Sequence, residues 1–595
     1  MDQERQLVSP VVAIGVTGHR TRSLPKPLRD QVGAVLLRIR RAAETGLASR
    51  ENPLWGQEVK LRIVSPLAEG ADRLVAQVAL GLGFTLQCAL PLPREEYVDD
   101  FKAPGSAEEF RTLLGKAERV FELDPVADRS DAYLAAGRLV LQQSDILIAI
   151  WDGDAPRGKG GTAQIVAEAL HRGLPVVWLK PSAIEAPTIL SGSLARPVRH
   201  DLDVLDKAVA RFVAPPAADQ RKCKTSLRSF LKEGRPIGLV AGGYQAFVNL
   251  MMLRFRWPRL RRGHWLSESR GIWTAPFAGH SHVHAASEPC LEEGISTAFA
   301  RADALATQYA GLYRTTYLVN YGLSAVAVTL ALIGATTGGP GSFAPWEAAC
   351  ILAIVVFTGS ANLFHFHERW IDYRRLAEMI RPLRYLFPIG LTLPTNNPPN
   401  YLERERAPEG WVEWLAGRVE RELGLPNVAV TPDYLQSVRS FVTKSILQEQ
   451  IDYHRRNAAR LAVVDKRLHR LGFGLFILTG LACLLPMSPV HALVESWRGR
   501  WNLQRGLTWA SGILPAFGAA MVGVRNVGEF TRLELRSDAM KRALEKARTS
   551  LDEPTSISGG RRHLAVELEA LAVQMMSETA DWRTLVITRH IELPS

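Results

Sequence analysis

The first apolar stretch of the chain ends in a short polar turn whose groups could bind an anion. Val11 to Ile14 is apolar and mostly β-branched, and it leads into the turn Gly15 to Arg20. Such a run favours a buried parallel strand, and open α/β sheets place their ligands at the carboxyl ends of strands. Glycine lets backbone amides approach an anion closely, and histidine and arginine add donors. The candidate binding residues in this turn are Thr17, Gly18, His19 and Arg20. Many strands without a ligand end in similar turns, so a nucleotide site here depends on the rest of the chain.

A second strand-like run, Leu61 to Ser65, is followed by an acidic turn at the start of a helix. The turn contains Glu69, Gly70 and Asp72. Its carboxylates have two interpretations. Acids in the first turn stabilise a helix through its dipole, whereas an acidic residue in dinucleotide-binding folds bonds to ribose hydroxyls. We treat these three residues as candidate ligand-binding residues.

A third turn is rich in glycine and also opens a helix. It follows Asp145 to Trp151, the most strand-like run in this part of the chain. The amides at the start of such a helix offer donors and the positive end of a dipole to a phosphate. The candidate residues are Gly158, Lys159, Gly160, Gly161 and Thr162. The spacing of a Walker A loop is absent.

Strand-like and helical patterns alternate along this region, which predicts an α/β domain. Apolar residues recur at helical spacing over 26–45, 73–82, 133–143 and 163–171, and further strand-like runs cover 84–90 and 176–179. The polar, proline-containing segment 91–101 is interpreted as a loop at the rim of the site. A parallel sheet would bring the three turns together at one edge, because its strands end there.

The three turns, in this order and context, resemble motifs of the SLOG superfamily, which is named for Smf/DprA and LOG proteins. The resemblance covers about the first third of the chain and implies a Rossmann-like fold that binds a nucleotide or a nucleotide-derived ligand. Relatives that resemble LOG split a base from a ribose phosphate and carry a glutamate three residues after the Gly-Thr pair. Ile165 stands at that position here and has no proton to exchange, which favours a sensor over an enzyme. The alternative is a membrane-tethered nucleotide or NAD-like N-glycosidase or phosphoribohydrolase, with Glu69, Asp72 and Glu168 as its carboxylates.

Four long apolar segments in the second half of the chain predict two transmembrane hairpins. The segments cover 316–337, 346–366, 471–487 and 507–524, and about 20 apolar residues span a bilayer core. Basic clusters follow the second segment and precede the third. The positive-inside rule therefore places the central segment and both termini in the cytoplasm.

The residues that follow the first hairpin resemble SLATT domains. The resemblance rests on His367-Glu368-Arg369-Trp370 and on the later pair Ala377-Glu378. SLATT domains pair two membrane helices with cytosolic helices, accompany nucleotide-sensing modules in prokaryotic conflict systems and are thought to form pores. The second hairpin looks like a weaker copy of the same unit.

Composition limits the cofactors and partners. The net charge of +12 would attract either nucleic acid or anionic lipid. The Arg/Trp-rich stretch 254–265 could likewise bind either partner, and the nearby membrane segments favour lipid. The five cysteines are scattered without a Cys-x-x-Cys pair, so we expect no disulfide framework and no structural zinc. His280, His282 and His284 are interpreted as part of a solvated linker rather than a metal site. We expect no resident cofactor, and as partners a nucleotide-derived ligand, the bilayer and further copies of the chain, but not nucleic acid.

These observations predict an α/β, Rossmann-like domain followed by an all-α membrane domain with four transmembrane helices. The expected divisions are a SLOG-like domain with a helical extension over 8–260, a linker over 261–295, a first hairpin unit over 296–390, a cytosolic helical connector over 391–447, a second hairpin unit over 448–550 and C-terminal cytosolic helices over 551–595. The two resemblances imply the function of a prokaryotic effector, and the spans and basic clusters place it in the bacterial inner membrane with both termini cytoplasmic. Its ligand would trigger oligomerisation, pore formation or membrane disruption in anti-phage defence.

Overall fold

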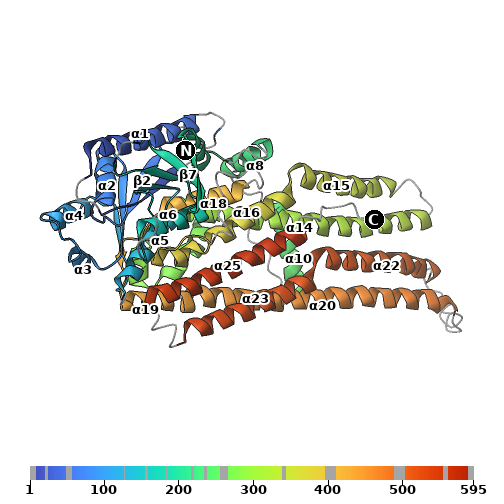
Figure 1. Cartoon of the computed structure of the whole chain (residues 1–595). Helices are drawn as coiled ribbons and strands as arrows, with labels where there is room; N and C mark the ends of the chain where they lie inside the picture. Colours follow the sequence, from blue (N-terminus) through green and yellow to red (C-terminus); the bar gives the residue numbers. More distant parts are fainter. Residues whose placement is uncertain are drawn as a thin grey trace.

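The fold consists of an N-terminal α/β domain and a long all-helical region, as the sequence predicts (Figure 1). The computed structural model describes residues 9–20, 24–48, 52, 57–125, 128–154, 159–182, 185–215, 220–233, 238–254, 265–291, 293–337, 343–394, 410–487, 503–553 and 560–586.

A nine-stranded sheet forms the centre of the α/β domain, in the order β8-β7-β6-β5-β1-β2-β3-β4-β9. The strands are β1 (Val11–Gly18), β2 (Lys60–Ser65), β3 (Thr85–Leu90), β4 (Arg119–Glu122), β5 (Ile146–Ile150), β6 (Val176–Leu179), β7 (Thr188–Ser193), β8 (Arg196–His200) and β9 (Val428–Ala429). The neighbouring strands in the part of the sheet ordered β6-β5-β1-β2-β3-β4-β9 pair in parallel. Strands β7 and β8 pair antiparallel at the other edge of the sheet, beside β6. The central strands are buried on both faces, which explains their continuous apolar runs.

Helices cover the sheet because each presents an apolar stripe to it. They are α1 (Lys26–Ala48), α2 (Ala71–Gly81), α3 (Arg94–Val98), α4 (Ser106–Leu114), α5 (Arg129–Gln142), α6 (Thr162–His171) and α7 (Asp203–Val213). In α1 the buried residues include Leu28, Val32, Leu36 and Ile39, spaced by three or four positions. The segment 91–101, which we expected to be a rim loop, contains α3.

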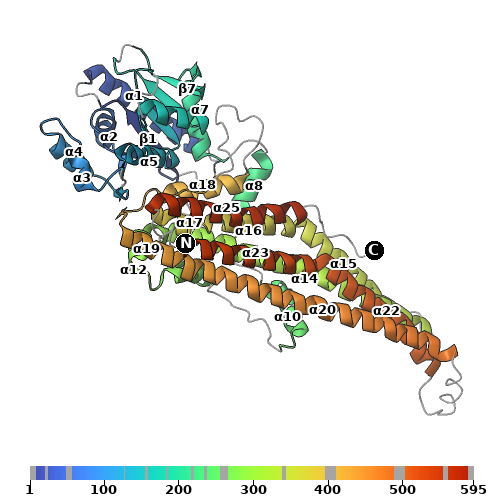
Figure 2. The ribbon, with the colours of Figure 1, turned by 60° about the horizontal axis from the view of Figure 1, so that its bottom comes forward.

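The connector after the first hairpin completes the α/β domain. Its helix α18 (Trp411–Leu423) precedes β9, which pairs in parallel with β4. The end of α18 and the residues after it lie against the strands: Arg62 of β2 donates to the Arg421 carbonyl at 2.7 Å, and the Leu425 amide donates to Gln87 of β3 at 2.9 Å. The expected domain 8–260 is therefore incomplete without residues from the connector. Figure 2 shows α18 between the sheet and the helical region.

A buried ion pair joins α18 to the centre of the sheet. Asp145, directly before β5, lies 3.2 Å from Arg418 and 3.2 Å from Arg421, and its side chain is 1% exposed. It also accepts a hydrogen bond from the Ala13 amide of β1 at 3.0 Å. Burial opposes ionisation of Asp145, but the two arginines and the hydrogen bonds outweigh it and lower the pKa.

The segment 261–295, which we expected to be a linker, is folded over its described residues. The preceding helices are α8 (Gln220–Lys232), α9 (Gly238–Ala241) and α10 (Gly243–Met251), and the segment itself contains α11 (Trp265–Thr274), η2 (Ala275–Phe277), α12 (Ser281–Ala286) and α13 (Glu288–Leu291). Trp273 is fully buried and donates to the Cys290 carbonyl at 2.7 Å, and Phe277 stacks on Phe441. These aromatic side chains form a core for the segment. The small and polar residues around them made the segment resemble a linker in the sequence. His280 starts α12 next to Ser445, and no group of metal ligands occurs among the described residues.

Among the residues that the structure describes, four helices are long and apolar enough to cross a membrane, which indicates a membrane protein. The predicted spans correspond to α14 (Glu293–Thr336), α15 (Ala344–Leu363), α20 (Gln448–Leu484) with η5 (Leu485–Met487), and α22 (Leu503–Gly528), and the second, predicted to reach residue 366, ends with α15 at Leu363. Between 11% and 17% of each apolar stretch is buried within the chain, so these helices are not the core of a soluble bundle. They form a row, α15-α14-α22-α20, that extends away from the sheet in Figures 1 and 2.

The two hairpins follow the same path. In each, the second span ends at a residue other than glycine with a left-handed backbone, His365 (φ 51°) or Glu529 (φ 45°). An exit helix then returns along the first long helix of its own hairpin, α16 (Phe366–Ile380) along α14 and α23 (Phe530–Leu551) along α20. The remaining elements are α17 (Leu383–Leu386), η3 (Phe387–Ile389), α19 (Pro432–Phe441), the π-helix η4 (Val442–Leu447) and α25 (Gly560–Val586).

Replacing Asp145 with Ala should destabilise the protein by about 3 kcal/mol or more, because two arginines would stay buried without their carboxylate. Thermal unfolding of the full chain in detergent, followed by circular dichroism, measures the effect. Asp203→Ala is the control, since Asp203 pairs with Arg38 but is 83% exposed and should change little. Equal melting temperatures for the two variants would contradict the role of Asp145.

Candidate functional site

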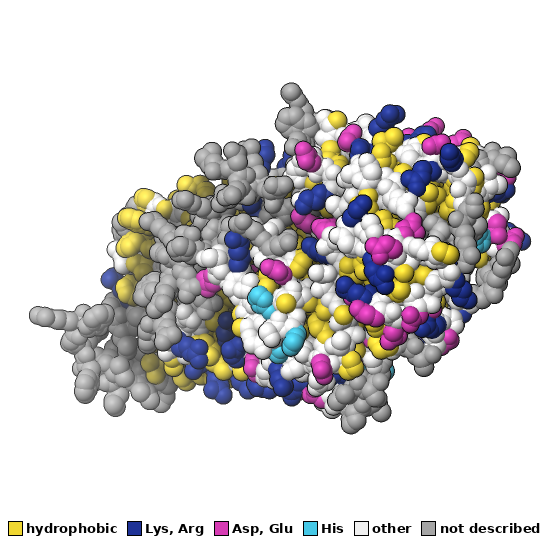
Figure 3. All heavy atoms as spheres, turned by 90° about the vertical axis from the view of Figure 1, so that its left-hand side faces the viewer, with side chains coloured by type: hydrophobic (Ala, Val, Ile, Leu, Met, Phe, Trp, Pro, Cys, Tyr) yellow, Lys and Arg dark blue, Asp and Glu magenta, His cyan; other side chains and the backbone are white. Residues whose placement is uncertain are grey.

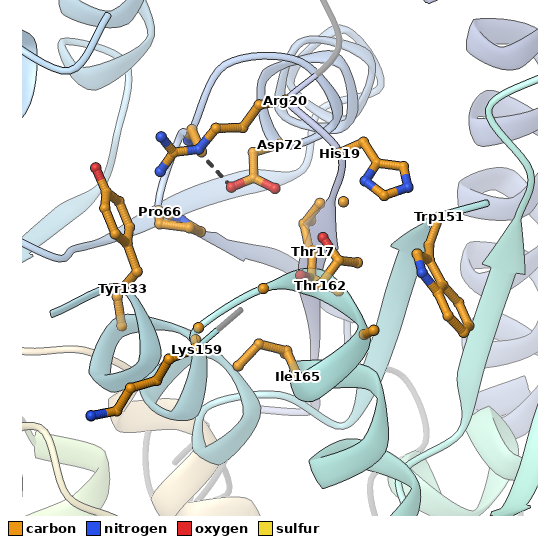
Figure 4. Close-up of a pocket in the computed structure, with 18 of the residues that line it drawn as sticks. Thr17, His19, Arg20, Pro66, Asp72, Tyr133, Trp151, Lys159, Thr162 and Ile165 are labelled. Atoms are coloured by element: carbon orange, nitrogen blue, oxygen red, sulfur yellow. Dashed lines mark hydrogen bonds between the residues drawn. The ribbon is translucent and has the colours of Figure 1, made fainter. Parts of the chain in front are cut away.

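A cleft of about 550 Å³ opens at the point where the strand order reverses. From β1 the chain builds the sheet outward through β2, β3 and β4, and then returns to place β5 on the other side of β1. Ligands of open α/β sheets bind at this switch point, at the carboxyl ends of the strands. The cleft lies there, between the turns that follow β1 and β5 and the starts of α5 and α6 (Figure 4).

The turn after β1 is fixed by its neighbours. The His19 amide donates to the Ile150 carbonyl of β5 at 3.1 Å, and the His19 carbonyl accepts from the Ala71 amide at 3.3 Å. The His19 ring lies 3.0 Å from the Asp152 carboxylate. Thr17, Gly18, His19 and Arg20 all line the cleft. A Cβ at Gly18 would lie 2.3 Å from the Ala71 Cβ and 2.8 Å from the Ile150 carbonyl, so tight packing requires this glycine.

Arg20, Tyr133 and Asp72 converge on one end of the cleft in Figure 4. The Arg20 guanidinium lies 4.4 Å from the centre of the Tyr133 ring, within range of a cation–π interaction. The Tyr133 hydroxyl donates to Asp100, which also pairs with Arg129. Asp72 accepts from the Ala68 amide at 3.2 Å. Burial raises the pKa of Asp72 to about 7, against the lowering effects of that hydrogen bond and of Arg20.

The glycine-rich turn places the start of α6 at the opposite wall. Gly161 is the N-cap of α6, and Gly161, Thr162 and Ala163 line the cleft, so the positive end of this helix faces it. Gly160 has φ 77° and donates from its amide to the Gln164 side chain at 2.9 Å. Lys159 also lines the cleft, and its ammonium group pairs with Asp131 at 2.5 Å. Gly158 lies outside the described residues.

Of the three carboxylates considered for catalysis, only Asp72 lines the cleft. Glu69 accepts from the Ser106 hydroxyl at 2.5 Å, at the start of α4. Glu168 forms a bidentate pair with Arg138 at 2.8 and 2.9 Å. Partial burial opposes ionisation of Glu168, but the hydrogen bonds and charge of Arg138 lower its pKa. Gly70, with φ 90°, precedes α2 and does not line the cleft.

Several cleft residues were not among the predicted ones. Those with polar or aromatic side chains are Tyr97, Ser130, Tyr133, Trp151, Asp152 and Asp154. The sequence holds a signal for Trp151 to Asp154, because they end the most apolar strand and strand ends meet at one edge of a parallel sheet. No local pattern in the sequence predicts Tyr97 as a cleft residue, because the tertiary packing of α3 brings it there.

Charged side chains on the visible face of the α/β domain (Figure 3) do not mark out a surface for nucleic acid. On the face that Figure 3 shows, acidic and basic side chains are interspersed. The positive groups at the cleft are instead the start of α6, Arg20 and Lys159, of which Lys159 pairs with Asp131, and they suit a small anion. Of the Arg/Trp-rich stretch, residues 255–264 lie outside the described residues.

Replacing Gly18 with Ala should lower the melting temperature by several degrees, because the added methyl group would overlap Ala71 and the Ile150 carbonyl. The matched control is Gly81→Ala in α2, where a Cβ meets nothing within 4 Å and should be neutral or stabilising. Unfolding curves of the three proteins compare these effects. If the Gly18→Ala protein were as stable as the Gly81→Ala protein, the turn after β1 could shift to accommodate the methyl group, and the packing requirement for Gly18 would be contradicted.

Replacing Asp72 with Asn should change how stability depends on pH. Asp72 ionises near its ordinary pKa of 3.8 in the unfolded chain but at about 7 in the folded chain. Its contribution to stability is therefore complete below about pH 4 and is lost as the pH rises to about 7. The melting temperature of Asp72→Asn relative to the wild type should rise between about pH 4 and about pH 7 and stay level above that. A constant difference across this range would contradict the assignment.

Comparisons with known proteins identify one match, in the helical region. Residues 298–391 match the model of a family described as a protein of unknown function, DUF4231. The match runs from within α14 through η3 and so covers the first hairpin with its exit helix. No curated protein and no solved structure matches the chain.

Proposed function

We propose that this protein is a prokaryotic membrane effector whose SLOG-like domain senses a nucleotide or a nucleotide-derived second messenger. Ligand binding would alter the assembly of its SLATT-like membrane helices. The proposal rests on one arrangement: the cleft lies at the carboxyl ends of the strands, at the switch point of the sheet. At the other end of the strands, the sheet contacts α18, which belongs to the connector between the two membrane hairpins. The protein would act in the bacterial inner membrane, with both termini cytoplasmic.

The cleft has the features of a site for a small phosphorylated molecule. Its volume of about 550 Å³ falls in the usual range of about 300 to 1,000 Å³ for small-molecule pockets. The start of α6 and the Arg20 side chain offer positive charge to a phosphate. Ile165 occupies the position of the LOG-type glutamate and is 3% exposed, which favours sensing over hydrolysis.

Two helices connect the cleft with the membrane part. Ser130 and Tyr133, at the start of α5, line the cleft, while Gln143 after its end donates to the Gly390 carbonyl at 3.3 Å. Gly390 directly follows η3, at the end of the first hairpin unit. The Arg138–Glu168 pair ties α5 to α6. A ligand that moved the starts of these helices would therefore act on the base of the membrane hairpin, because packed helices move as rigid bodies.

The exposed faces of the membrane helices support assembly as the output. Leu352 and Leu363 of α15 are 64% and 73% exposed, and Phe473 and Leu484 of α20 are 60% and 62% exposed. These helices lie at opposite edges of the row. Four helices in a row enclose no pore, so pore formation or membrane disruption in anti-phage defence would need several copies of the chain.

The second candidate is the membrane-tethered N-glycosidase or phosphoribohydrolase. Asp72 favours it, because a buried carboxyl group with a pKa of about 7 is suited to act as a general acid. The Glu69 and Glu168 carboxylates lend no support, since each is held by the partner described above.

The test uses the full chain in detergent and a panel of AMP, ADP-ribose, cyclic di-AMP and cyclic GMP-AMP. Calorimetry measures binding, and light scattering measures the mass of the assembly. At least one nucleotide should bind and raise the mass, and Arg20→Glu should weaken binding at least about 10-fold by placing a negative charge at the cleft. Arg111→Glu is the matched control, because Arg111 is 61% exposed on α4 and does not line the cleft.

A wild-type chain that stays monomeric with and without every nucleotide would overturn the effector proposal. Release of free base, detected by chromatography and lost in Asp72→Asn, would favour the enzyme instead.

A further inference from the structure

The Tyr97 hydroxyl is buried in the wall of the cleft without a partner. Tyr97 lies in α3, is 0% exposed and lines the cleft. No described residue forms a hydrogen bond with its hydroxyl. Leaving a buried hydroxyl unpaired costs free energy, and native proteins retain few such groups.

Packing fixes the ring of Tyr97 in place. Its centre lies 4.9 Å from that of Phe101, 5.6 Å from that of Phe110 and 6.2 Å from that of Tyr133. Arg73 supports the Phe101 ring from 4.4 Å and is itself anchored to Ser106. A ring held on several sides cannot swing out to reach water, so the hydroxyl stays at the wall of the cleft.

An acceptor shares this end of the cleft with Tyr97. Asp72 lines the cleft, and the residue as a whole is 4% exposed. Its carboxyl group interacts electrostatically with Tyr97 and Arg20. Tyr97 can donate a hydrogen bond, whereas ionised Asp72 can only accept. Ionised Asp72 offsets the charge of Arg20 at this end, and a phosphate offers Asp72 no donor, so this end suits a neutral group that both donates and accepts.

We propose that Tyr97 and Asp72 bind a sugar hydroxyl of the ligand, with the Tyr97 hydroxyl donating to it and Asp72 accepting from it. The phosphate then lies at the start of α6, at the other wall. This assignment rests on the proposed nucleotide site and adds to it which part of the nucleotide each wall recognises.

The first test is the stability of the chain without ligand. Tyr97→Phe removes only the unpaired hydroxyl, so its melting temperature should equal or exceed that of the wild type. Tyr434→Phe is the matched control, because the Tyr434 hydroxyl is buried and donates to the Pro388 carbonyl at 2.8 Å. The control should lose stability. A clear loss in Tyr97→Phe would mean that its hydroxyl has a structural partner, and would overturn the proposal.

The second test combines each protein with two probes, AMP and its 2′,3′-dideoxy analogue, in calorimetric titrations of the full chain in detergent. The wild type should bind AMP about 10-fold more tightly than the analogue, because the analogue leaves the donor and the acceptor unpaired. In Tyr97→Phe that ratio should fall to about 3-fold or less, while affinity for the analogue stays within about 2-fold of the wild type. Tyr434→Phe should keep the wild-type ratio.

The outcomes separate this inference from the proposed function. A wild-type chain that binds AMP, with the same preference over the analogue in Tyr97→Phe, overturns the role of Tyr97 and leaves the nucleotide site intact. A wild-type chain that binds neither probe nor any member of the nucleotide panel overturns both.

Discussion

The contact between the sheet and the connector depends on one buried ion-pair cluster, in which Arg418 and Arg421 neutralise Asp145. Arg418 and Arg421 lie more than 270 positions later in the chain than Asp145. Between them the chain forms the flank of the sheet, the helices after it and the whole first membrane hairpin. The charge at the centre of the sheet is therefore balanced by residues that follow that hairpin in the chain, which ties the two parts together.

Much of the fold was predictable because local patterns encode it. The predicted helix 26–45 corresponds to α1, since its apolar residues repeat at the period of a helix, and the four spans stand out by length and composition. Strand β9 has two residues and pairs across about 300 positions, so nothing local in the sequence could reveal it. The folded segment 261–295 was missed because its buried aromatics are spaced among small residues typical of linkers.

The candidate site was predictable at the level of strand ends but not of side-chain direction. The turns after β1 and before α6 reach one cleft, because parallel strands end at a common edge. Glu69 and Asp72 are three positions apart, yet Glu69 bonds to Ser106 and Asp72 lines the cleft. Lys159 likewise turns to Asp131. Those directions are set by α4 and α5, which are distant in sequence from the turns they contact. Gly18 lines the cleft and is also required by the tight packing against Ala71 and Ile150, which residue type alone does not reveal.

The open row of membrane helices has a geometric consequence for assembly. Its edges are two different helices, α15 and α20, so a contact between the edge of one copy and the opposite edge of the next is heterologous. Such contacts do not stop at a dimer: they close into a ring if the rotation from copy to copy divides a full circle, and otherwise continue as an open spiral or sheet. The size of an assembly built in this way is then set by the angle between neighbouring rows.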